Sequence, residues 1–475
     1  MILDLTGRVV SCQFSFSWKN KIEVFLLTKI GVIGGAGYVG LVTGVGLAAL
    51  GHDVISMDLD QKRLSGLRVG KSAVYEAGLE PILEQLNQMS QISFTDDLNE
   101  TVQNSDALFI AVGTPSLSDG AADLSAVIAV AEKLRDQISK YTVIVVKSTV
   151  PVGTLNIVND ILSQKLTEGE DFDVVSNPEF LREGSGLIDF FAPSRIIVGS
   201  NSERANGVLR EIYEPLLTGT TVVDVPWIES ERDIPYVETD AVSAQLTKYA
   251  ANAFLATRIS FINEIAGISE KVGGNIGDIV EGLGLDPRIG PGYLQPGIGF
   301  GGPCLDKDLR ALITVAGENS YDPVLFNGVL QRNELQLREV MNKITAAVGP
   351  SLYKKRIALL GLAFKEGTND VRHSLSIKLY RLLREQGASV IGHDSLAVEE
   401  ARELESGIEV TEDLGEALAD AEVIVALNSE PIYQSIDWSL VFSKATAHVI
   451  DTRGVLDGAG VELNGAIYEL MGRGK

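Results

Sequence analysis

The stretch Lys29–Gly40, KIGVIGGAGYVG, predicts the fold of the N-terminal part of this chain. Its apolar run predicts a buried strand, its glycines predict a tight turn, and Tyr38 and Val39 open a helix. Glycines at such a turn let the backbone approach a pyrophosphate, whose negative charge the helix N-terminus then meets. Asp58 ends the next predicted strand, where a carboxylate would bind ribose hydroxyls and repel a 2′-phosphate. The stretch therefore predicts a dinucleotide site that prefers NAD to NADP.

The glycine spacing fits two patterns. Gly35, Gly37 and Gly40 fit G-x-G-x-x-G and leave Gly34 as an extra residue. Gly34, Gly37 and Gly40 instead fit G-x-x-G-x-x-G, which is typical of short-chain dehydrogenases and sugar-nucleotide epimerases that need Tyr-x-x-x-Lys for proton transfer. None of the 12 tyrosines has a lysine four residues later, so the first pattern is favoured.

Composition excludes several classes of partner. The 475-residue chain has a net charge of −24, which argues against binding to nucleic acid or to an anionic membrane. No apolar run reaches the roughly 18 residues that a membrane helix needs. The four histidines are scattered, so no metal site is expected. Any anionic substrate must therefore be bound by local lysines and arginines.

Cysteine usage and the N-terminus indicate where the protein works. Cys12 and Cys304 lie far apart, which fits a reducing cytoplasm better than a disulfide framework. Charges interrupt the apolar pieces of residues 1–28, and no small-residue cleavage site follows them. We expect these residues to form a poorly ordered extension rather than a signal peptide.

An internal repeat predicts the architecture. Three pairs of segments resemble one another in the same order along the chain, as strand, turn and helix patterns do in related α/β domains. We therefore predict an α/β fold with two Rossmann-like, doubly wound domains, divided as residues 1–28, 29–225, 226–335 and 336–475. The paired segments are Lys29–Gly34 with Arg356–Gly361, Val54–Asp58 with Val390–Asp394, and Thr95–Pro115 with Thr411–Pro431.

The middle of the chain predicts one long helix. Asp240–Val272 has helical periodicity, no proline and a single glycine, Gly267. At about 1.5 Å per residue, such a helix is long enough to join the two domains and to carry a dimer interface.

Cys304 is the candidate nucleophile. It lies in the glycine-rich stretch Gly299–Asp308, GFGGPCLDKD, whose glycines would let a ligand approach the backbone. Lys307 and Asp308 follow three and four residues later, on the same side of a helical turn. A reactive thiol needs nearby positive charge, and a thioester needs a carboxylate or water for hydrolysis. With the dinucleotide site, this pattern indicates an oxidoreductase that passes through a thioester; the alternative is a small buried residue in a turn.

Two further pairs of polar residues have helical spacing. Glu179 and Glu183 are four residues apart, and so are Lys248 and Asn252 within the central helix. Such pairs are ordinarily solvated, but the apolar sequence around Lys248 predicts that it faces an interior or a cleft. Arg258 lies six residues after Asn252 and should point to a different surface.

Together these segments resemble the UDP-glucose/GDP-mannose dehydrogenase family from about Lys29 to Leu456. The order and spacing of several motifs carry the resemblance. The most specific pieces are Val112–Pro115, Asp119-Gly120, Asp123-Leu124, Lys147–Gly153, Asn177–Gly184, Lys248–Glu264, Gly301–Asp308, Gly361–Lys365 and Asp370–Arg372.

The resemblance implies a four-electron oxidation in two NAD-dependent steps. A sugar C6 hydroxyl becomes an aldehyde, Cys304 captures it as a thiohemiacetal, and a second hydride transfer leaves a thioester for hydrolysis. By resemblance, Lys248 and Asn252 stabilise charge on the substrate oxygen, whereas Glu179, Thr149 and Asp308 handle protons and water. The implied cofactor residues are Gly35, Gly37, Tyr38, Val39, Gly40, Asp58, Lys62, Arg63, Thr114, Thr149, Glu183, Lys307 and Arg372.

The resemblance also implies a substrate site. The implied residues are Glu179, Phe180, Leu181, Arg182, Glu183, Lys248, Asn252, Arg258, Tyr293, Leu294, Gln295, Pro296, Gly297, Gly301 and Lys365, with Arg258 contributed across a homodimer or larger assembly. Asp306 stands where the family often has proline, and an acid beside a thiolate would raise the pKa of the thiol.

The residues after the cysteine bear on which sugar is oxidised. Lys307-Asp308 after the cysteine resembles the branch that oxidises UDP-glucose, whereas GDP-mannose and other nucleotide sugars remain alternatives. A non-catalytic sensor of NAD or nucleotide sugars is the rival from another class. Such a sensor would not need Lys248, Asn252, Cys304 and Asp308 together, which disfavours it.

Overall fold

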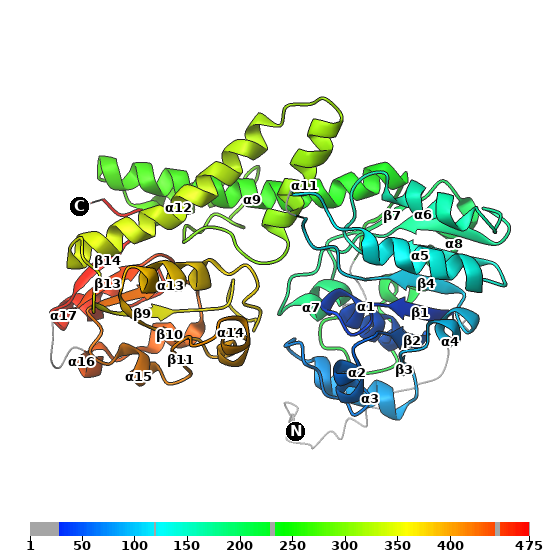
Figure 1. The fold of residues 1–475 in the computed structure, drawn as a ribbon, viewed down its shortest axis with the longest axis horizontal. Coiled ribbons are helices and arrows are strands. Elements are labelled where there is room, and N and C mark those ends of the chain that lie inside the picture. The colour runs from blue at the N-terminus through cyan, green and yellow to red at the C-terminus, as the bar shows by residue number, and fades with distance from the viewer. Residues whose placement is uncertain (1–27, 118–119, 229–232, 442–446, 475) are drawn as a thin grey trace, which may run out of the picture.

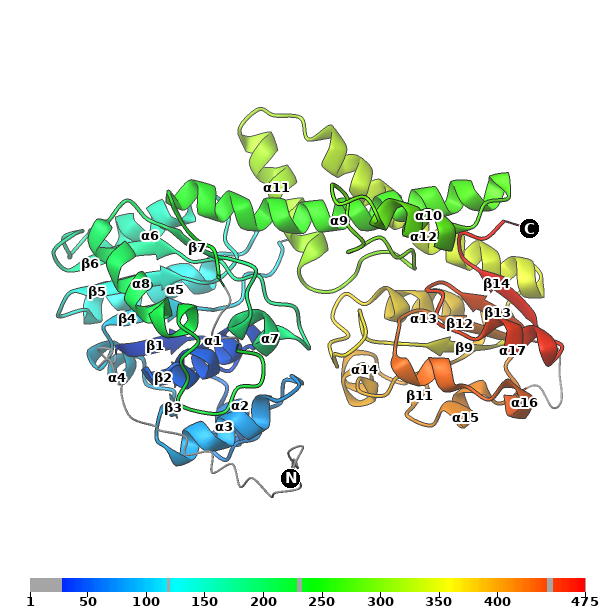
Figure 2. The same cartoon turned by 180° about the vertical axis from the view of Figure 1, so that it is seen from behind.

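The computed structural model describes residues 28–117, 120–228, 233–441 and 447–474. Two open sheets, each with helices on both faces, form the two ends of the molecule, and long helices join them (Figures 1 and 2). The predicted α/β architecture, with two Rossmann-like domains and a helical middle, is confirmed. Cys12 and nearly all of the predicted N-terminal extension lie outside the described residues.

The first sheet has the strand order β3-β2-β1-β4-β5-β6-β7-β8. Its neighbours are parallel except for the antiparallel pair β6 and β7. The first six strands follow the order of dinucleotide-binding domains. The strands are β1 (Lys29–Ile33), β2 (Asp53–Met57), β3 (Ile92–Thr95), β4 (Ala107–Ile110), β5 (Thr142–Val146), β6 (Phe172–Ser176), β7 (Ile196–Gly199) and β8 (Tyr236–Thr239).

Helices cover both faces of this sheet, which explains why its central strands are almost wholly apolar. Every residue of β4 and of β5 is buried. The helices are α1 (Tyr38–Ala49), α2 (Gln61–Leu67), α3 (Leu79–Gln88), α4 (Leu98–Gln103), α5 (Ser125–Gln137), α6 (Thr154–Leu162), α7 (Gly186–Phe191) and α8 (Glu203–Leu217).

The second sheet is fully parallel and has the order β11-β10-β9-β12-β13-β14. The three repeated segment pairs fall on equivalent strands: β1 with β9, β2 with β10, and the β3–β4 unit with the β11–β12 unit. Its elements are β9 (Arg356–Leu360), α13 (Leu375–Glu385), β10 (Ser389–His393), α14 (Val398–Leu404), β11 (Val410–Thr411), α15 (Leu414–Leu418), β12 (Val423–Ala426), η1 (Pro431–Ser435), α16 (Trp438–Val441), β13 (His448–Asp451), α17 (Gly458–Leu463) and β14 (Ile467–Leu470).

The predicted central helix is α9 (Ala241–Val272), with 32 residues. It begins at Asp240, whose carboxylate accepts the N–H of Ser243 at 2.8 Å, and ends at Gly273 in the left-handed conformation that terminates helices. Three more helices pack around it or continue the chain: α10 (Ile276–Gly284), α11 (Leu305–Glu318) and α12 (Val324–Val348).

The C-terminal tail fastens the second domain to the far end of α9. The carbonyl of Gly472 accepts both the Ser269 hydroxyl at 2.8 Å and the Ile276 N–H at 3.0 Å. Lys343 of α12 lies between Glu270 and Glu469, at 2.8 and 2.7 Å. These contacts hold the second sheet against the middle helices.

The proposed division at residue 225 falls in the loop between α8 and β8, whereas that at residue 335 falls inside α12. β8 lies beyond residue 225 and pairs with β7 of the first sheet, and α12 runs across residue 335. Within the described part of the chain, we find no helix whose length and apolar character would let it cross a bilayer.

Candidate active site

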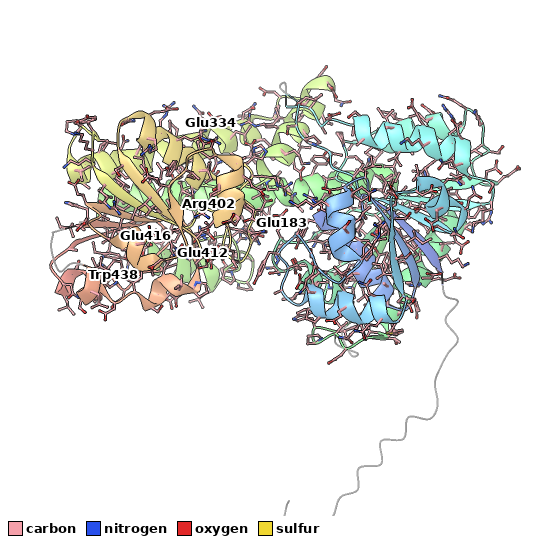
Figure 3. The ribbon with its side chains drawn as sticks, turned by 60° about the horizontal axis from the view of Figure 1, so that its bottom comes forward. Glu183, Glu334, Arg402, Glu412, Glu416 and Trp438 are labelled. Atoms are coloured by element: carbon pink, nitrogen blue, oxygen red, sulfur yellow. The ribbon has the colours of Figure 1, made fainter. Side chains whose placement is uncertain are left out.

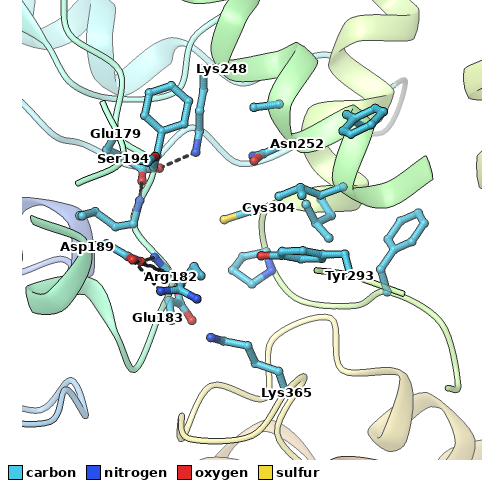
Figure 4. Close-up of a pocket in the computed structure, with 18 of the residues that line it drawn as sticks. Glu179, Arg182, Glu183, Asp189, Ser194, Lys248, Asn252, Tyr293, Cys304 and Lys365 are labelled. Atoms are coloured by element: carbon cyan, nitrogen blue, oxygen red, sulfur yellow. Dashed lines mark hydrogen bonds and ion pairs between the residues drawn. The ribbon is translucent and has the colours of Figure 1, made fainter. Parts of the chain in front are cut away.

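A cavity of about 900 Å³ lies between the two sheets and beside α9 (Figure 4). Its walls come from the loop after β6, from α9, from the segment 293–305, and from the loops that follow β9, β12 and β13. These loops leave the carboxyl ends of strands, the edge at which open α/β sheets bind ligands.

Lys248 and Glu179 form a buried ion pair on this wall, with Nζ 3.0 Å from Oε1. Lys248 projects from α9, whereas Glu179 lies in the turn after β6 and also accepts the N–H of Leu181 at 2.5 Å. Burial favours the neutral amine, but the charges of Glu179 and Asp308 outweigh it and raise the pKa of Lys248. The ammonium is therefore charged at neutral pH and faces the cavity, as the sequence predicts for this residue (Figure 4).

Asn252 lies one helical turn after Lys248 on the same face of α9. Its Nδ2 donates to Asp308 Oδ2 at 2.5 Å, and Asp308 Oδ1 pairs with Lys307 Nζ at 2.5 Å. Asp308 is only 1% exposed and lies behind the cavity wall rather than on it. The carboxylate therefore fixes the orientation of the Asn252 carboxamide beside Cys304 (Figure 4).

Cys304 immediately precedes α11, and its thiol points into the cavity between Lys248 and Asn252 (Figure 4). The residue opens to solvent through the cavity, but protein surrounds the thiol on its other sides. Burial, followed by the carboxylates of Asp308 and Glu179, raises the pKa of the thiol to about 12, while Lys248 opposes this rise. The thiol is therefore protonated at neutral pH.

Asp306 does not act on the thiol in the way predicted for an acid next to it in sequence. Its carboxylate points along α11 and accepts from Arg310 Nε at 2.8 Å. Because the start of α11 directs Asp308 inward, Asp308 is the carboxylate with the largest effect on the Cys304 pKa, followed by Glu179 and Glu183.

The glycines before Cys304 let residues of the second domain pack directly against their backbone. A Cβ on Gly302, whose φ is +82°, would lie 2.5 Å from the Phe364 ring, and one on Gly301 would lie 2.8 Å from the carbonyl oxygen of His373. The prediction that these glycines serve a ligand is therefore incomplete, because at both positions the approaching group belongs to the C-terminal domain.

The segment Tyr293–Gly297 joins the middle of the chain to the second sheet. Gln295 Nε2 donates to the carbonyl of Arg453 at 2.8 Å, and Arg453 donates to the carbonyl of Pro296 at 3.2 Å. Tyr293 and Gln295 line the cavity, whereas Leu294 is buried in an apolar cluster beneath it. Lys365 enters the cavity from the opposite side (Figure 4).

Glu183 lies between the two domains and lines both this cavity and a second one (Figure 3). Its Oε1 is 3.4 Å from the guanidinium of Arg372, which also binds Asp370. Burial, and then the charge of Asp370, raises the pKa of Glu183 to about 8, although Arg372 opposes this shift. The position of Glu183 links the two cavities.

The second cavity, of about 1260 Å³, lies over the glycine turn of the first sheet. Gly34 carries the positive φ of the turn, +87°, and a Cβ on Gly40 would lie 2.1 Å from the Gly34 carbonyl oxygen. The extra glycine is therefore part of the tight turn. The open N-terminus of α1, which no side chain caps, and the carboxylate of Asp58 on the cavity wall fit a pyrophosphate and a ribose.

A buried network ties this turn to the loop that carries Glu183. The Tyr38 hydroxyl donates to Glu76 Oε2 at 2.6 Å and accepts the N–H of Gly186 at 3.1 Å. Glu76 Oε1 accepts the N–H of Leu187 at 3.0 Å. The two loops that approach a dinucleotide and a substrate are thus held together by one carboxylate.

The structure gathers most of the predicted site residues around the two cavities. Those on the first cavity are Glu179, Phe180, Leu181, Arg182, Glu183, Lys248, Asn252, Tyr293, Gln295, Gly301, Cys304 and Lys365. Those on the second are Gly37, Tyr38, Asp58, Lys62, Arg63, Glu183 and Arg372.

Other predicted residues stand behind these walls. Thr114 Oγ1 donates to the carbonyl of Thr149 at 2.8 Å, which ties together the loops after β4 and β5. The walls of the two cavities do not include Gly35, Val39, Gly40, Thr114, Thr149, Arg258, Leu294, Pro296, Gly297, Lys307 or Asp308.

Arg258 does not line either cavity, in agreement with the different surface expected from its helical position. Its two terminal nitrogens donate to the carbonyls of Ile289 and Gly290, at 2.7 and 2.8 Å. Within this chain Arg258 thus holds the loop after α10.

Three cations on the first cavity were missed from the sequence: Lys147, Arg195 and Arg453. Lys147 and Arg453 follow strands closely, and a charge just beyond an apolar strand is the signal that could have found them. Arg195 precedes β7 and stacks on Phe180, 3.6 Å from the ring centroid, a contact that sequence does not predict.

Comparisons with known proteins agree along the chain. Models of the UDP-glucose/GDP-mannose dehydrogenase family match as the NAD binding domain over residues 28–217, the central domain over residues 242–335 and the UDP binding domain over residues 358–458.

Individual relatives match over nearly their whole lengths. The chain is 40% identical to a UDP-glucose 6-dehydrogenase of Rhizobium meliloti (strain 1021), covering 94% of this chain and 99% of that protein. It is 38% identical to UDP-glucose 6-dehydrogenase TuaD of Bacillus subtilis (strain 168), covering 94% of each. The solved structure of a UDP-glucose dehydrogenase from the hyperthermophilic archaeon Pyrobaculum islandicum matches with a TM-score of 0.85 and 36% identity, covering 95% of this chain and 99% of that one.

Proposed function

The chain belongs to the UDP-glucose/GDP-mannose dehydrogenase family, and from this premise we propose that it oxidises C6 of UDP-glucose to the carboxylate of UDP-glucuronate. It is an NAD-dependent oxidoreductase. The observation that carries the proposal is the convergence of the Cys304 thiol, the Lys248 ammonium and the Asn252 carboxamide on one cavity. Glu183 joins that cavity to the cleft over the glycine turn.

The glycine turn, the N-terminus of α1 and Asp58 would hold NAD, which when bound supplies the hydride acceptor for both oxidations. In the first oxidation, Lys248 and Asn252 stabilise the negative charge that develops on the C6 oxygen as the alcohol becomes an aldehyde. Glu179 is ion-paired with Lys248 on the same cavity wall, and it is the carboxylate that we propose takes part in moving the proton of that oxygen.

Cys304 then adds to the aldehyde carbon, and the thiol proton passes to the carbonyl oxygen to give a thiohemiacetal. Loss of a second hydride and of the hydroxyl proton converts this adduct to a thioester. Water adds to the thioester, the C–S bond breaks, and the products are the carboxylate and the free thiol. Asp308 lies behind the cavity wall, so in this proposal it supports the hydrolysis through the Asn252 carboxamide that it orients, with Thr149 behind the wall as a further polar group.

UDP-glucose is proposed as the sugar nucleotide because the relatives described above carry that name and Lys307-Asp308 follows the nucleophile. Lys365 supplies positive charge at the cavity for a diphosphate, and Arg182, which is ion-paired with Asp189 at 2.7 Å, adds N–H donors there. GDP-mannose and other nucleotide sugars are the alternatives that the assay below separates.

We also infer a homodimer built on α9. Phe254, Phe261 and Ile268 recur at heptad spacing and are 61%, 49% and 53% exposed, an apolar stripe suited to a second copy of the helix. Arg258 lies beside this stripe, where it would reach the partner's substrate.

A cytoplasmic location is proposed because a working Cys304 must stay reduced.

The test is an assay with NAD and a panel of UDP-glucose, GDP-mannose and UDP-N-acetylhexosamines. We expect turnover of UDP-glucose with two NADH formed for each sugar acid. A ratio of one would contradict the thioester route, turnover of another sugar alone would contradict the substrate, and no turnover with any sugar would favour the sensor.

A further inference from the structure

Lys147 is a buried lysine on the cavity wall to which the steps above give no role. It follows β5 directly, and its Nζ lies 3.0 Å from Asn177 Oδ1 and 3.3 Å from the Tyr213 hydroxyl. The Tyr213 hydroxyl donates to the same Asn177 oxygen at 2.7 Å, and Asn177 Nδ2 donates to the carbonyl of Ile197 at 2.8 Å. The Asn177 carboxamide therefore has hydrogen-bond partners on β7, on α8 and directly after β5.

This cluster fixes the turn that carries Glu179. Asn177 directly follows β6, stands two positions before Glu179 and is 1% exposed. Because its carboxamide has partners at both its oxygen and its nitrogen, the start of the turn has a single orientation. Breaking the contact with Lys147 would leave the Asn177 oxygen with Tyr213 alone.

The same lysine places a second positive charge near the ion pair. The charged and titratable groups that act on it are Glu179 and Lys248, together with the phenol of Tyr213, whose pKa burial raises so that it stays neutral. Burial lowers the pKa of Lys147 to about 8; the charge of Glu179 opposes this shift and that of Lys248 adds to it. At neutral pH two ammonium groups therefore flank one carboxylate.

We propose that Lys147 is a positioning residue of the oxidation, which orients the Glu179 turn through Asn177 and adds its charge to the field of Lys248 at the substrate oxygen. This inference rests on the proposed function. A positive charge in a wall that excludes water stabilises a nearby negative charge far more than it would in bulk water. It therefore favours the transition state in which the C6 oxygen becomes negative. Lys248 acts by contact, whereas Lys147 acts through the turn and through the field.

The kinetic test compares Lys147→Met, Lys147→Arg and wild type from pH 7 to pH 9.5. Lys147→Met should have a kcat about ten-fold below wild type at pH 7. The deficit should shrink to about two-fold at pH 9.5, since the wild-type amine has by then lost its proton. Lys147→Arg keeps its charge, so its kcat relative to wild type should rise over the same range.

The matched control is Lys165→Met, which removes an exposed lysine paired with Asp136. Its kcat relative to wild type should not depend on pH. A deficit of Lys147→Met that is the same at every pH describes a purely structural residue and overturns the proposal.

A second measurement needs no turnover, so it separates this inference from the proposed function. A lysine whose pKa is lower in the folded than in the unfolded chain makes wild type less stable as the pH falls from about 10.5 to about 8. The Tm difference between Lys147→Met and wild type should therefore move in favour of the variant between pH 10 and pH 7. A Tm difference that does not change with pH would contradict the claim that Lys147 is a buried ammonium. If no nucleotide sugar is oxidised, the proposed function fails. The pH dependence of the Tm difference then decides by itself whether Lys147 is a charged ammonium in the folded protein.

Discussion

Glu179 and Lys248 approach to 3.0 Å at the cavity wall, although one follows a strand of the first sheet and the other lies on the central helix. Less than a tenth of either side chain is exposed. The position of the helix over the sheet therefore sets the charge at the substrate oxygen. Removing one partner of such a pair leaves the other buried without compensation.

A double-mutant cycle on this pair should show strong coupling. Lys248→Met should lower kcat by about 100-fold or more, because the oxygen loses its closest positive charge. It should also lower the free energy of unfolding by about 3 kcal/mol in urea titrations. Adding Glu179→Gln should restore part of that stability, since no unpaired carboxylate is left. Two effects that simply add would show that the residues do not form a buried pair.

Cys304→Ser should stop the reaction after the first oxidation or at a stable ester. In a rapid-mixing experiment about one NADH per active site should form if the reaction stops after the first oxidation, and about two if it reaches the ester, which mass spectrometry should detect as an acyl adduct. The control is Cys12→Ser, which replaces the chain's other cysteine and should turn over fully with two NADH per sugar. Complete turnover by Cys304→Ser would show that the reaction does not need the Cys304 thiol.

Asp58 should set the preference between the two dinucleotides. Its Oδ2 accepts the N–H of Ala36 at 2.9 Å, so the carboxylate is held at the edge of the glycine turn. Asp58→Ala should raise the ratio of kcat/KM for NADP to that for NAD by about ten-fold or more, because the repulsion of the 2′-phosphate is lost. Asp53→Ala, an exposed acid at the start of β2, serves as the control. Equal use of both dinucleotides by wild type would contradict the role of Asp58.

Glu183 should make the stability of the protein depend on pH. A carboxyl whose pKa rises to about 8 on folding keeps its proton in the native state, so wild-type stability falls as the pH rises from about 4.5 to about 8. Glu183→Gln lacks this titration. The free energy of unfolding of the variant relative to wild type should therefore increase by about 2–4 kcal/mol between pH 5 and pH 8.5. A relative stability that is flat across this range would contradict a protonated Glu183.

Arg258 should act across a dimer interface. Arg258→Ala should mainly raise KM for the nucleotide sugar, because the lost guanidinium would contact its negative charge. Mixed dimers of Arg258→Ala and Cys304→Ser should regain activity at low substrate concentration, since one of their two sites has both an intact Arg258 and an intact Cys304.

The reassociation experiment needs dissociation before mixing and verification of the hybrid by mass. Each variant carried alone through the same steps is the control and should show no gain. Verified hybrids without recovered activity, or an active monomer in light scattering, would place Arg258 within its own subunit.

The two domains, the central helix and the type of chemistry could be predicted from the amino-acid sequence. Strand and helix periodicity, the turn at Gly34–Gly40 and the capping aspartate Asp240 are local features, and local features depend on residues close together in the chain. The spacing of Lys248 and Asn252 was enough to place them on one face of α9. Motif order along the chain was enough to indicate the family.

Which of these residues come into contact depends on the tertiary structure. Asp308 rather than Asp306 acts on Cys304 because the direction of α11 turns one carboxylate inward and the other toward Arg310. Lys147 meets the turn before Glu179 because β5 and β6 are neighbours in the sheet. Such contacts depend on how distant elements pack, and burial then sets the charges, since desolvation is a property of the assembled cavity and not of any segment.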